Sequence, residues 1–268
     1  MMDKDPNEKP PWQSAPPGES AWERAEREEE AEKFAAFGKR IVPWGVGDAI
    51  IVLLAAWLIL LAVSLIFGIR FLPPPVGRFT SLLGAIIGYA LLFALVWGVA
   101  VRLRGGTPSE LGFNGFSVLS AAVQAIIWWI VIRAITALYV ITLQRLGISP
   151  SSAQAERLVR LFGRGFLGLV LALLVAVVIA PFVEELLFRG FVYSAFRQSV
   201  GVGWAIFIDG VIFALVHFDL YLFVPLAVIG FVLAWLYERS YSLGPPIFLH
   251  ALNNLASIIV LYTAASAR

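Results

Sequence analysis

Long apolar runs separated by short polar stretches dominate the chain after residue 41. A spanning helix needs about 20 predominantly apolar residues, and seven of the runs approach or exceed that length. The predicted spans are residues 44–68, 79–101, 118–144, 166–187, 203–217, 221–237 and 246–264. The fifth and sixth are short, and the stretches 185–200 and 149–165 leave room for an eighth. The pattern predicts an all-α fold, a polytopic transmembrane helical bundle of about seven or eight spans.

Residues 1–40 differ in character from the rest of the chain. Five prolines within the first 17 residues disfavour regular structure. Residues 20–37 then place Glu and Arg or Lys at i,i+3 and i,i+4 spacings, which favours a charged helix. We therefore divide the chain into a polar tail (1–40), with a cytoplasmic or interfacial helix at 20–37, and a transmembrane domain (41–268). We expect residues 20–37 to be a solvated helix or a disordered tail, or else a helix that docks on a partner.

The composition agrees with membrane embedding and excludes several kinds of site. Hydrophobic residues make up 60% of the chain and charged residues 14%, against about 45–50% and 25% in soluble domains. The absence of cysteine excludes disulfides, thiolate metal sites and a cysteine nucleophile. No feature suggests a nucleic-acid partner. We expect an integral, multi-pass protein of a bacterial plasma membrane, in contact with the lipid bilayer. Its orientation stays open, because basic residues divide almost evenly between the two sets of loops.

Acidic residues are rare in the apolar part of the chain, so each one requires an explanation. Two of them are adjacent, Glu184 and Glu185. Successive helical residues point about 100° apart, so these two carboxylates cannot share one direction. Glu185 and Arg189 are i,i+4 and can pair on one face, which leaves Glu184 without a cation of its own. Glu184 is therefore a candidate general base, although charges flanking the end of a membrane helix would have the same pattern.

Both histidines of the chain lie in late apolar segments and have a partner at helical spacing. Phe213 precedes His217 by one turn, and His250 and Asn254 are i,i+4. Glu184 and His217 lie about equally far from the polar turn between their segments, so they have similar depth if both segments are helical. His250 is closer to the turn before its own segment. A glutamate, two histidines and an asparagine are the groups needed to activate a water molecule and stabilise an oxyanion.

Three short segments follow one another on successive apolar runs: EELLFR (184–189), FALVH (213–217) and LHALNN (249–254). In this order they closely resemble the three motifs of the CPBP family of intramembrane proteases. This family is also called the ABI or CAAX protease and bacteriocin-processing family, and it includes the type II CAAX prenyl endopeptidases. The resemblance covers about residues 178–260. It implies a membrane-embedded endopeptidase whose substrate is a membrane-associated peptide or protein.

The resemblance also implies a role for each matching residue. Glu184 would be the general base, and His217 would help to polarise the attacking water. His250 and Asn254 would stabilise the tetrahedral oxyanion, with three residues in support: Glu185, Arg189 and Phe213. The resemblance favours water activated without an obligatory cofactor. A divalent metal such as zinc stays an alternative, because a glutamate and two histidines can form a His₂Glu ligand set.

Other interpretations of these features remain open. A non-catalytic membrane scaffold of the same family, or a proton-coupled transporter with Glu184 in a relay, would use the same residues. No repeated pair of broken apolar segments supports the transporter. The GVGD sequence at 45–48 matches the GxGD signature of intramembrane aspartyl proteases, but it opens the first span, which favours a juxtamembrane turn. Arg133, in the middle of the third span, is either half of an ion pair with Asp209 or a contact for substrate or lipid.

Overall fold

The computed structural model describes Ser20, Trp22 and Arg24 and then residues 41–67, 74–148 and 161–266. Two compact units are distinguished, Met1–Ile41 and Val42–Arg268. Apart from the three residues named, the predicted tail helix at 20–37 lies outside the described residues. Most of the stretch 149–165, the other candidate for an eighth span, also lies outside them.

The described part of the second unit consists of helices and their connections and contains no strand. Segments labelled η have the wider π-helical hydrogen bonding. The elements are α2 (Val46–Phe67), α3 (Pro74–Trp97), η2 (Gly98–Leu103), α4 (Val118–Arg145), α6 (Phe166–Leu173), η3 (Leu174–Ile179), α7 (Ala180–Glu185), η4 (Leu186–Tyr193), α8 (Ser194–Val200), α9 (Val202–Val216), α10 (Phe223–Ser240) and α11 (Gly244–Ser266).

The protein is an integral, multi-pass membrane protein with an all-α fold. Among the described residues, six helices are long and apolar enough to cross a membrane, and α9, with 15 residues, is a shorter apolar helix. Together these seven correspond to the seven predicted runs. The largest difference concerns the fourth run, which continues as one helical path from Phe166 to Val200. The stretch 185–200 therefore extends this helix and does not form an eighth span.

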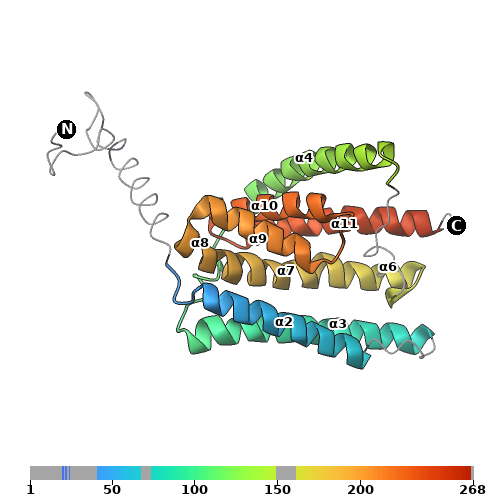
Figure 1. Ribbon diagram of the computed structural model, residues 1–268, viewed down its shortest axis with the longest axis horizontal. Coiled ribbons are helices and arrows are strands. Elements are labelled where there is room, and N and C mark those ends of the chain that lie inside the picture. Colours follow the sequence, from blue (N-terminus) through green and yellow to red (C-terminus); the bar gives the residue numbers. More distant parts are fainter. Residues whose placement is uncertain are drawn as a thin grey trace. The chain divides into compact units, whose positions relative to one another are not determined.

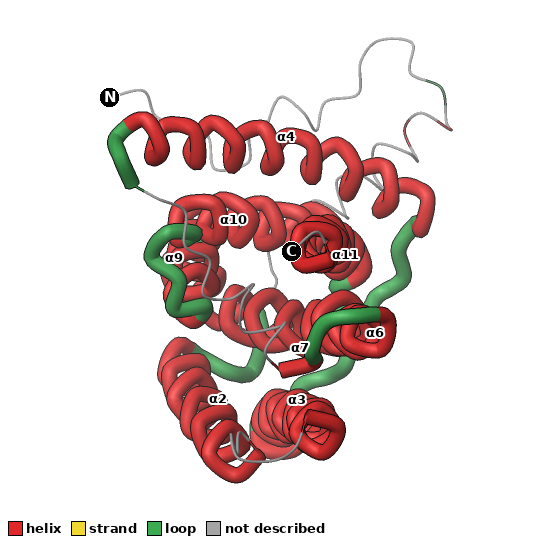
Figure 2. The backbone as a smooth tube through the Cα atoms, turned by 90° about the vertical axis from the view of Figure 1, so that its right-hand side faces the viewer, coloured by secondary structure: helices red, strands yellow, loops and turns green. Residues whose placement is uncertain are grey.

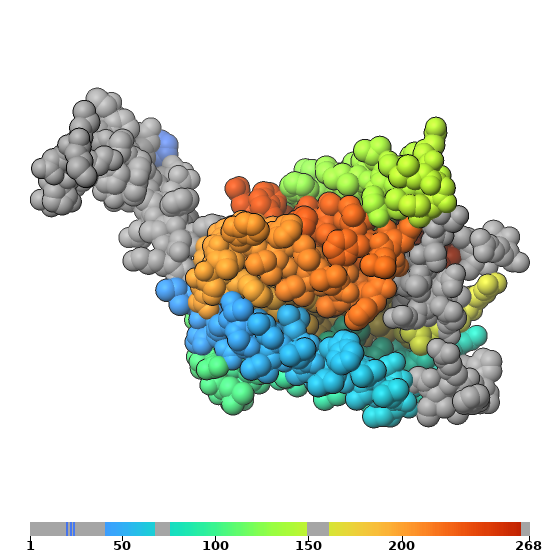
Figure 3. All heavy atoms as spheres, in the orientation of Figure 1, coloured from blue at the N-terminus to red at the C-terminus, as the bar shows by residue number. Residues whose placement is uncertain are grey.

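The path from α6 to α8 lies in the middle of the bundle (Figures 1 and 2). The α2–α3 hairpin packs on one side of it, α9, α10 and α11 lie on the other, and α4 lies outermost against α10 and α11 (Figure 2). In Figure 3 the blue atoms of α2 adjoin orange atoms above them, the colour of the chain around residue 200. In agreement with this view, α2 contacts α8. This order places α6–α8 where residues from both sides can reach it.

Glycines allow the closest helix contacts in the bundle. A Cβ atom added to Gly84 of α3 would lie 2.7 Å from the Cβ of Phe67 in α2. A Cβ added to Gly230 of α10 would lie 2.8 Å from the Cα of Gly210 in α9. Neither position has room for a larger residue, which is typical of helices that pack within a membrane.

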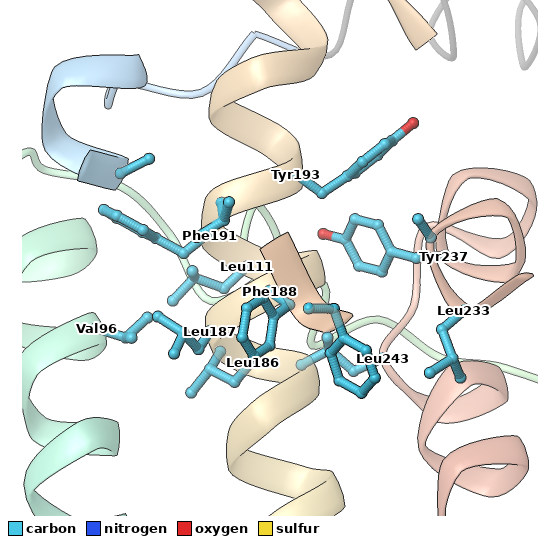
Figure 4. Close-up of a cluster of buried hydrophobic side chains, with 14 of the residues drawn as sticks. Val96, Leu111, Leu186, Leu187, Phe188, Phe191, Tyr193, Leu233, Tyr237 and Leu243 are labelled. Atoms are coloured by element: carbon cyan, nitrogen blue, oxygen red, sulfur yellow. The ribbon is translucent and has the colours of Figure 1, made fainter. Parts of the chain in front are cut away.

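A cluster of buried side chains surrounds η4, the segment that follows the adjacent glutamates (Figure 4). All eight residues of η4 are buried. Leu187 lies beside Val96 of α3, and Tyr193 packs edge-on against Tyr237 of α10, with ring centroids 5.9 Å apart. A helix that is buried on all sides needs mainly apolar residues. The few polar side chains of this segment are therefore enclosed by the side chains packed around them.

The two π-helical segments η3 and η4 flank the short α7. Such segments are rare and occur often at functional sites. In η4, the backbone carbonyl of Phe191 accepts a hydrogen bond from Nε1 of Trp44 at 3.0 Å, and the two rings stack with centroids 5.2 Å apart. The chain just before α2 is thereby fixed against the middle of the bundle.

Residues 45–48 form a turn at the start of α2. The backbone N–H of Gly45 donates to Oδ2 of Asp48 at 2.9 Å, and Nε of Arg104 donates to its Oδ1 at 3.0 Å. Both oxygens of this aspartate are therefore used locally. The geometry agrees with the interpretation of this sequence as a juxtamembrane turn.

Candidate active site

A cavity of about 670 Å³ lies among α2, α3, α4, the path from α6 to α8, α9, α10 and α11. The four candidate catalytic residues line it, namely Glu184, His217, His250 and Asn254, as does the supporting residue Phe213. They come from α7, from the C-terminal end of α9 and from α11, segments that are far apart along the chain. The structure thus brings the candidate base, both imidazoles and the amide to one cavity.

Glu184 is partly exposed to this cavity, with 19% of its side chain accessible. Its Oε1 accepts a hydrogen bond from the Tyr89 hydroxyl on α3 at 2.9 Å. Its Oε2 lies 3.8 Å from Nε2 of His250, which is too long for a direct hydrogen bond. In the described part of the chain no lysine or arginine pairs with Glu184. The carboxylate is held at one oxygen and open at the other.

Glu185 is fully buried and has different partners. Its Oε1 accepts from Nη1 of Arg189 at 3.0 Å, the i,i+4 pair expected from the sequence, and from Nδ1 of His250 at 2.7 Å. Arg189 also donates from Nη2 to the carbonyl of Gly230 at 3.0 Å. Its Nε lies 3.4 Å from Oδ2 of Asp209, a charge contact without hydrogen-bond geometry. One buried guanidinium therefore serves two buried carboxylates.

The partners of the two imidazoles determine which ring nitrogen is free. Nδ1 of His217 lies 2.6 Å from the carbonyl oxygen of Phe213, and since a carbonyl only accepts, this nitrogen carries the proton. Nδ1 of His250 likewise donates to Glu185, whose Oε1 is an acceptor for Arg189 as well. In both rings Nε2 is the nitrogen left for a ligand.

Phe213 contacts three of the polar groups at once. Its ring centroid lies 4.6 Å from that of His217 and 5.6 Å from that of His250, which it meets edge-on. The guanidinium carbon of Arg189 lies 4.7 Å from the same ring. A single aromatic side chain thus fixes the distance between the two imidazoles.

Asn254 is one turn beyond His250 on α11. Its Nδ2 donates to the backbone carbonyl of Ala176 at 2.8 Å, within the π-helical segment η3. A primary amide has two N–H donors, so this bond orients the side chain and leaves the second donor for a ligand in the cavity.

The ion pair between Arg133 and Asp209 that the sequence suggested as one alternative is wrong. Asp209 contacts Arg189, because α9 packs directly against η4. Arg133 is on α4, beyond α10 and α11, and its Nη2 donates to the carbonyl and to Oδ1 of Asn253, each at 2.8 Å, and to Oγ of Ser257 at 2.9 Å.

A divalent metal such as zinc stays an alternative at this site. Among the described residues, no group of three or more His, Asp or Glu side chains is placed to hold a metal ion. Nδ1 of each histidine donates to a carbonyl or a carboxylate, which leaves both Nε2 atoms and Oε2 of Glu184 as the atoms that could bind a metal.

Tyr89 is a candidate that the sequence patterns did not single out. Its hydroxyl bonds directly to the candidate base, although it lies on α3, well before the first motif. A signal was present, because Tyr89 is the one tyrosine in the apolar run 79–101. A phenol in the middle of a span requires a hydrogen-bond partner, but the sequence gives no indication of which partner that is.

Comparisons with known proteins agree with the motifs. Residues 166–256 match the family model "Type II CAAX prenyl endopeptidase Rce1-like". A curated relative, "Putative membrane peptidase YdiL" of Bacillus subtilis (strain 168), is 32% identical over 90 residues. This alignment covers 34% of the present chain and 37% of the relative, so the chain spans little more than a third of the relative's length. No solved structure matches.

The matched region includes all three motif segments but neither Tyr89 nor Arg133. The comparisons therefore confirm the resemblance to the CPBP family for the part of the chain that contributes Glu184, His217 and His250 to the cavity.

Proposed function

We propose that this protein is an intramembrane endopeptidase of the CPBP type, which hydrolyses a peptide bond of a membrane-associated peptide or protein. One observation carries the proposal. Glu184, His217, His250 and Asn254 line a single cavity within a bundle of membrane-spanning helices, and Nε2 of His250 is 3.8 Å from Oε2 of Glu184.

Glu184 activates the attacking water in this proposal. Tyr89 holds Oε1, so Oε2 is the oxygen that takes the proton. Neutral His217, protonated at Nδ1, presents the lone pair of Nε2 and helps to orient the same water. The resulting hydroxide attacks the carbonyl carbon of the scissile bond. When the carbon–nitrogen bond breaks, Glu184 passes its proton to the leaving amine and returns to the carboxylate form.

His250 and Asn254 stabilise the oxyanion of the tetrahedral intermediate. With both ring nitrogens protonated, His250 donates through Nε2 while the Glu185 carboxylate faces Nδ1 and balances the charge. Asn254 donates through the amide hydrogen that Ala176 does not use. Loss of one such donor typically lowers kcat by about 10²–10³-fold. Arg189 and Phe213 act indirectly, by positioning Glu185 and the imidazoles.

Glu184→Gln tests the proposal, because it keeps the size of the side chain and removes the base. Membrane proteomes of cells with the wild type and with the variant are compared for precursors that accumulate only in the variant. Cleavage of such a precursor is then measured with purified protein in liposomes. Glu184→Gln and His217→Ala should abolish cleavage while the protein still accumulates. Glu110→Gln is the matched control, since Glu110 accepts a bond from its own loop residue Thr107, outside the cavity.

Two other outcomes would contradict the proposal. If a deletion has a phenotype that Glu184→Gln fully complements, the protein acts as a non-catalytic scaffold. If reconstituted wild-type protein moves protons across vesicles and Glu184→Gln does not, while no precursor accumulates, Glu184 belongs to a transport pathway.

A further inference from the structure

Arg133 is a cation near the middle of the membrane-spanning helix α4 (Val118–Arg145). In the described ranges no carboxylate pairs with it. Its hydrogen-bond acceptors, on Asn253 and Ser257 of α11, are all neutral. An arginine at this depth is costly and marks functional positions in membrane proteins. Besides these acceptors the guanidinium contacts the Trp129 ring, with its Cζ 5.7 Å from the ring centroid, so its charge has no counterion in the described ranges.

The guanidinium has donors to spare for such a counterion. It carries five N–H groups, and every hydrogen bond that it makes to a described residue starts from Nη2. Nε is buried without a partner. The side chain lines the same cavity as Glu184, His250 and Asn254. Asn253 and Ser257 fix one nitrogen of the group and leave the N–H donors along its other edge for a ligand.

We propose that Arg133 binds a carboxylate of the peptide substrate, supplied either by the peptide's C-terminus or by an acidic side chain. This assignment rests on the proposed peptidase function and adds a specificity residue outside the matched segment. A carboxylate fits the planar fork of a guanidinium with two parallel hydrogen bonds. Arg133 would thus select substrates by charge, and Glu184 would act on the bond.

The spacing on α11 sets where that carboxylate lies along the substrate. Asn253 and Ser257 follow His250 by three and seven residues, which is about 4.5 and 10.5 Å along the helix. An extended peptide advances about 3.3–3.6 Å per residue. The bound carboxylate therefore belongs to a residue within about three positions of the scissile bond.

The depth of Arg133 favours a peptide over a lipid phosphate. At 1.5 Å per residue, its position is about 18–22 Å from either end of α4. Lipid headgroups lie outside a hydrocarbon core of about 30 Å, so their phosphates are close to the helix ends. A peptide that reaches Glu184 already occupies the cavity that Arg133 lines.

The test measures binding in the Glu184→Gln background, where no cleavage interferes. The full-length protein in phosphatidylcholine nanodiscs is titrated with dodecanoyl-Ala-Leu-Val-Ala-Leu carrying either a free C-terminal carboxylate or a carboxamide. A second, amidated pair carries Glu or Gln in place of the central Val. At least one acidic peptide should bind about 10–100-fold more tightly than its neutral counterpart, and the preferred pair identifies the source of the carboxylate.

Adding Arg133→Gln should remove the acid preference, because glutamine keeps a polar amide at this position but has no charge. Arg133→Lys should keep part of it, since lysine retains the charge without the fork. Arg145→Gln is the matched control, because Arg145 is exposed at the end of the same helix and does not line the cavity. It should leave the preference unchanged.

The inference is overturned if, in each pair, the acidic and the neutral peptide bind with equal affinity. It is also overturned if none of the peptides binds, or if the acid preference persists in Arg133→Gln. It is also overturned if replacing part of the lipid by phosphatidylglycerol abolishes the preference, because the anion would then be a lipid phosphate. If Arg133→Gln does not accumulate, the inference is judged from two other results. These are the acid preference of the Glu184→Gln protein and its partial loss in Arg133→Lys. Acid preference without any cleavage by the wild type would refute only the peptidase function.

Discussion

Arg189→Gln should destabilise the protein strongly, because Arg189 is the cation shared by two buried carboxylates. Arg189, Glu185 and Asp209 all have side chains with no exposure. Removing one partner of a buried ion pair costs about 3–5 kcal/mol, and here one substitution leaves two acids without a cation. The contact of the guanidinium with the Phe213 ring at 4.7 Å is lost as well, which adds about 1–2 kcal/mol. We therefore expect a loss of about 5 kcal/mol or more.

The free energy of unfolding is measured by titration with sodium dodecyl sulfate in mixed micelles, with tryptophan fluorescence as the signal. In the Arg189→Gln background, Asp209→Asn should restore part of the loss, because it neutralises one of the two orphaned acids. The control is Arg104→Gln, which breaks an ion pair to Asp48 in which the arginine side chain is 49% exposed. An exposed pair contributes about 0–1 kcal/mol.

Two results would refute this reasoning. The free energy of unfolding of Arg189→Gln could lie within about 1 kcal/mol of that of Arg104→Gln, as expected if Arg189 contributed no more than an exposed pair. Alternatively, Asp209→Asn could add to the loss instead of offsetting it. In either case Arg189 would not be neutralising the buried acids that surround it.

Three further predictions concern the cavity and the helix packing. Tyr89→Phe should lower kcat by about 10-fold or more without changing accumulation, because the 2.9 Å bond that orients Glu184 is lost; an unchanged rate would argue against this role. Gly230→Ala should lower stability by about 1–3 kcal/mol through its contact with Gly210, whereas Gly203→Ala, with no atom within 4 Å of the added carbon, should be tolerated; thermal unfolding in detergent distinguishes them. Incubation with 1,10-phenanthroline should leave the initial rate of cleavage unchanged, and a loss of rate that zinc restores would show that the protein uses a metal ion.

The apolar runs predict the helices because, in a bilayer, the length of a run and the hydrogen bonding of its backbone are decided within the run itself. The ends are less well determined, and the fourth run shows why. EELLFR was a natural place to end a span because it is charged, but Glu185 and Arg189 neutralise each other within the bundle. The helix therefore continues to Val200. Only tertiary packing makes charges in the middle of this path acceptable.

The candidate site was predictable to the extent that its residues share a helix. The pairs Glu185–Arg189 and His250–Asn254 follow from i,i+4 spacing. Tyr89 does not, because its partner comes from a helix almost a hundred residues later in the chain. No periodicity within one segment encodes a contact between two segments. The position of His250 shows the same limitation, since the number of residues from a turn did not place it beside Glu184, yet their side chains face each other at 3.8 Å.

The two adjacent glutamates show how the bundle separates the roles of two identical side chains. One helical step of about 100° turns Glu185 towards Arg189 and His250, where no solvent reaches it. The same step turns Glu184 towards the cavity, where Tyr89 holds one oxygen and the other stays open. A carboxylate fixed by a cation and an imidazole can position a ring. The partly exposed carboxylate is the one that a water molecule in the cavity can reach, so the environment, and not the residue type, is the reason for proposing Glu184 as the base.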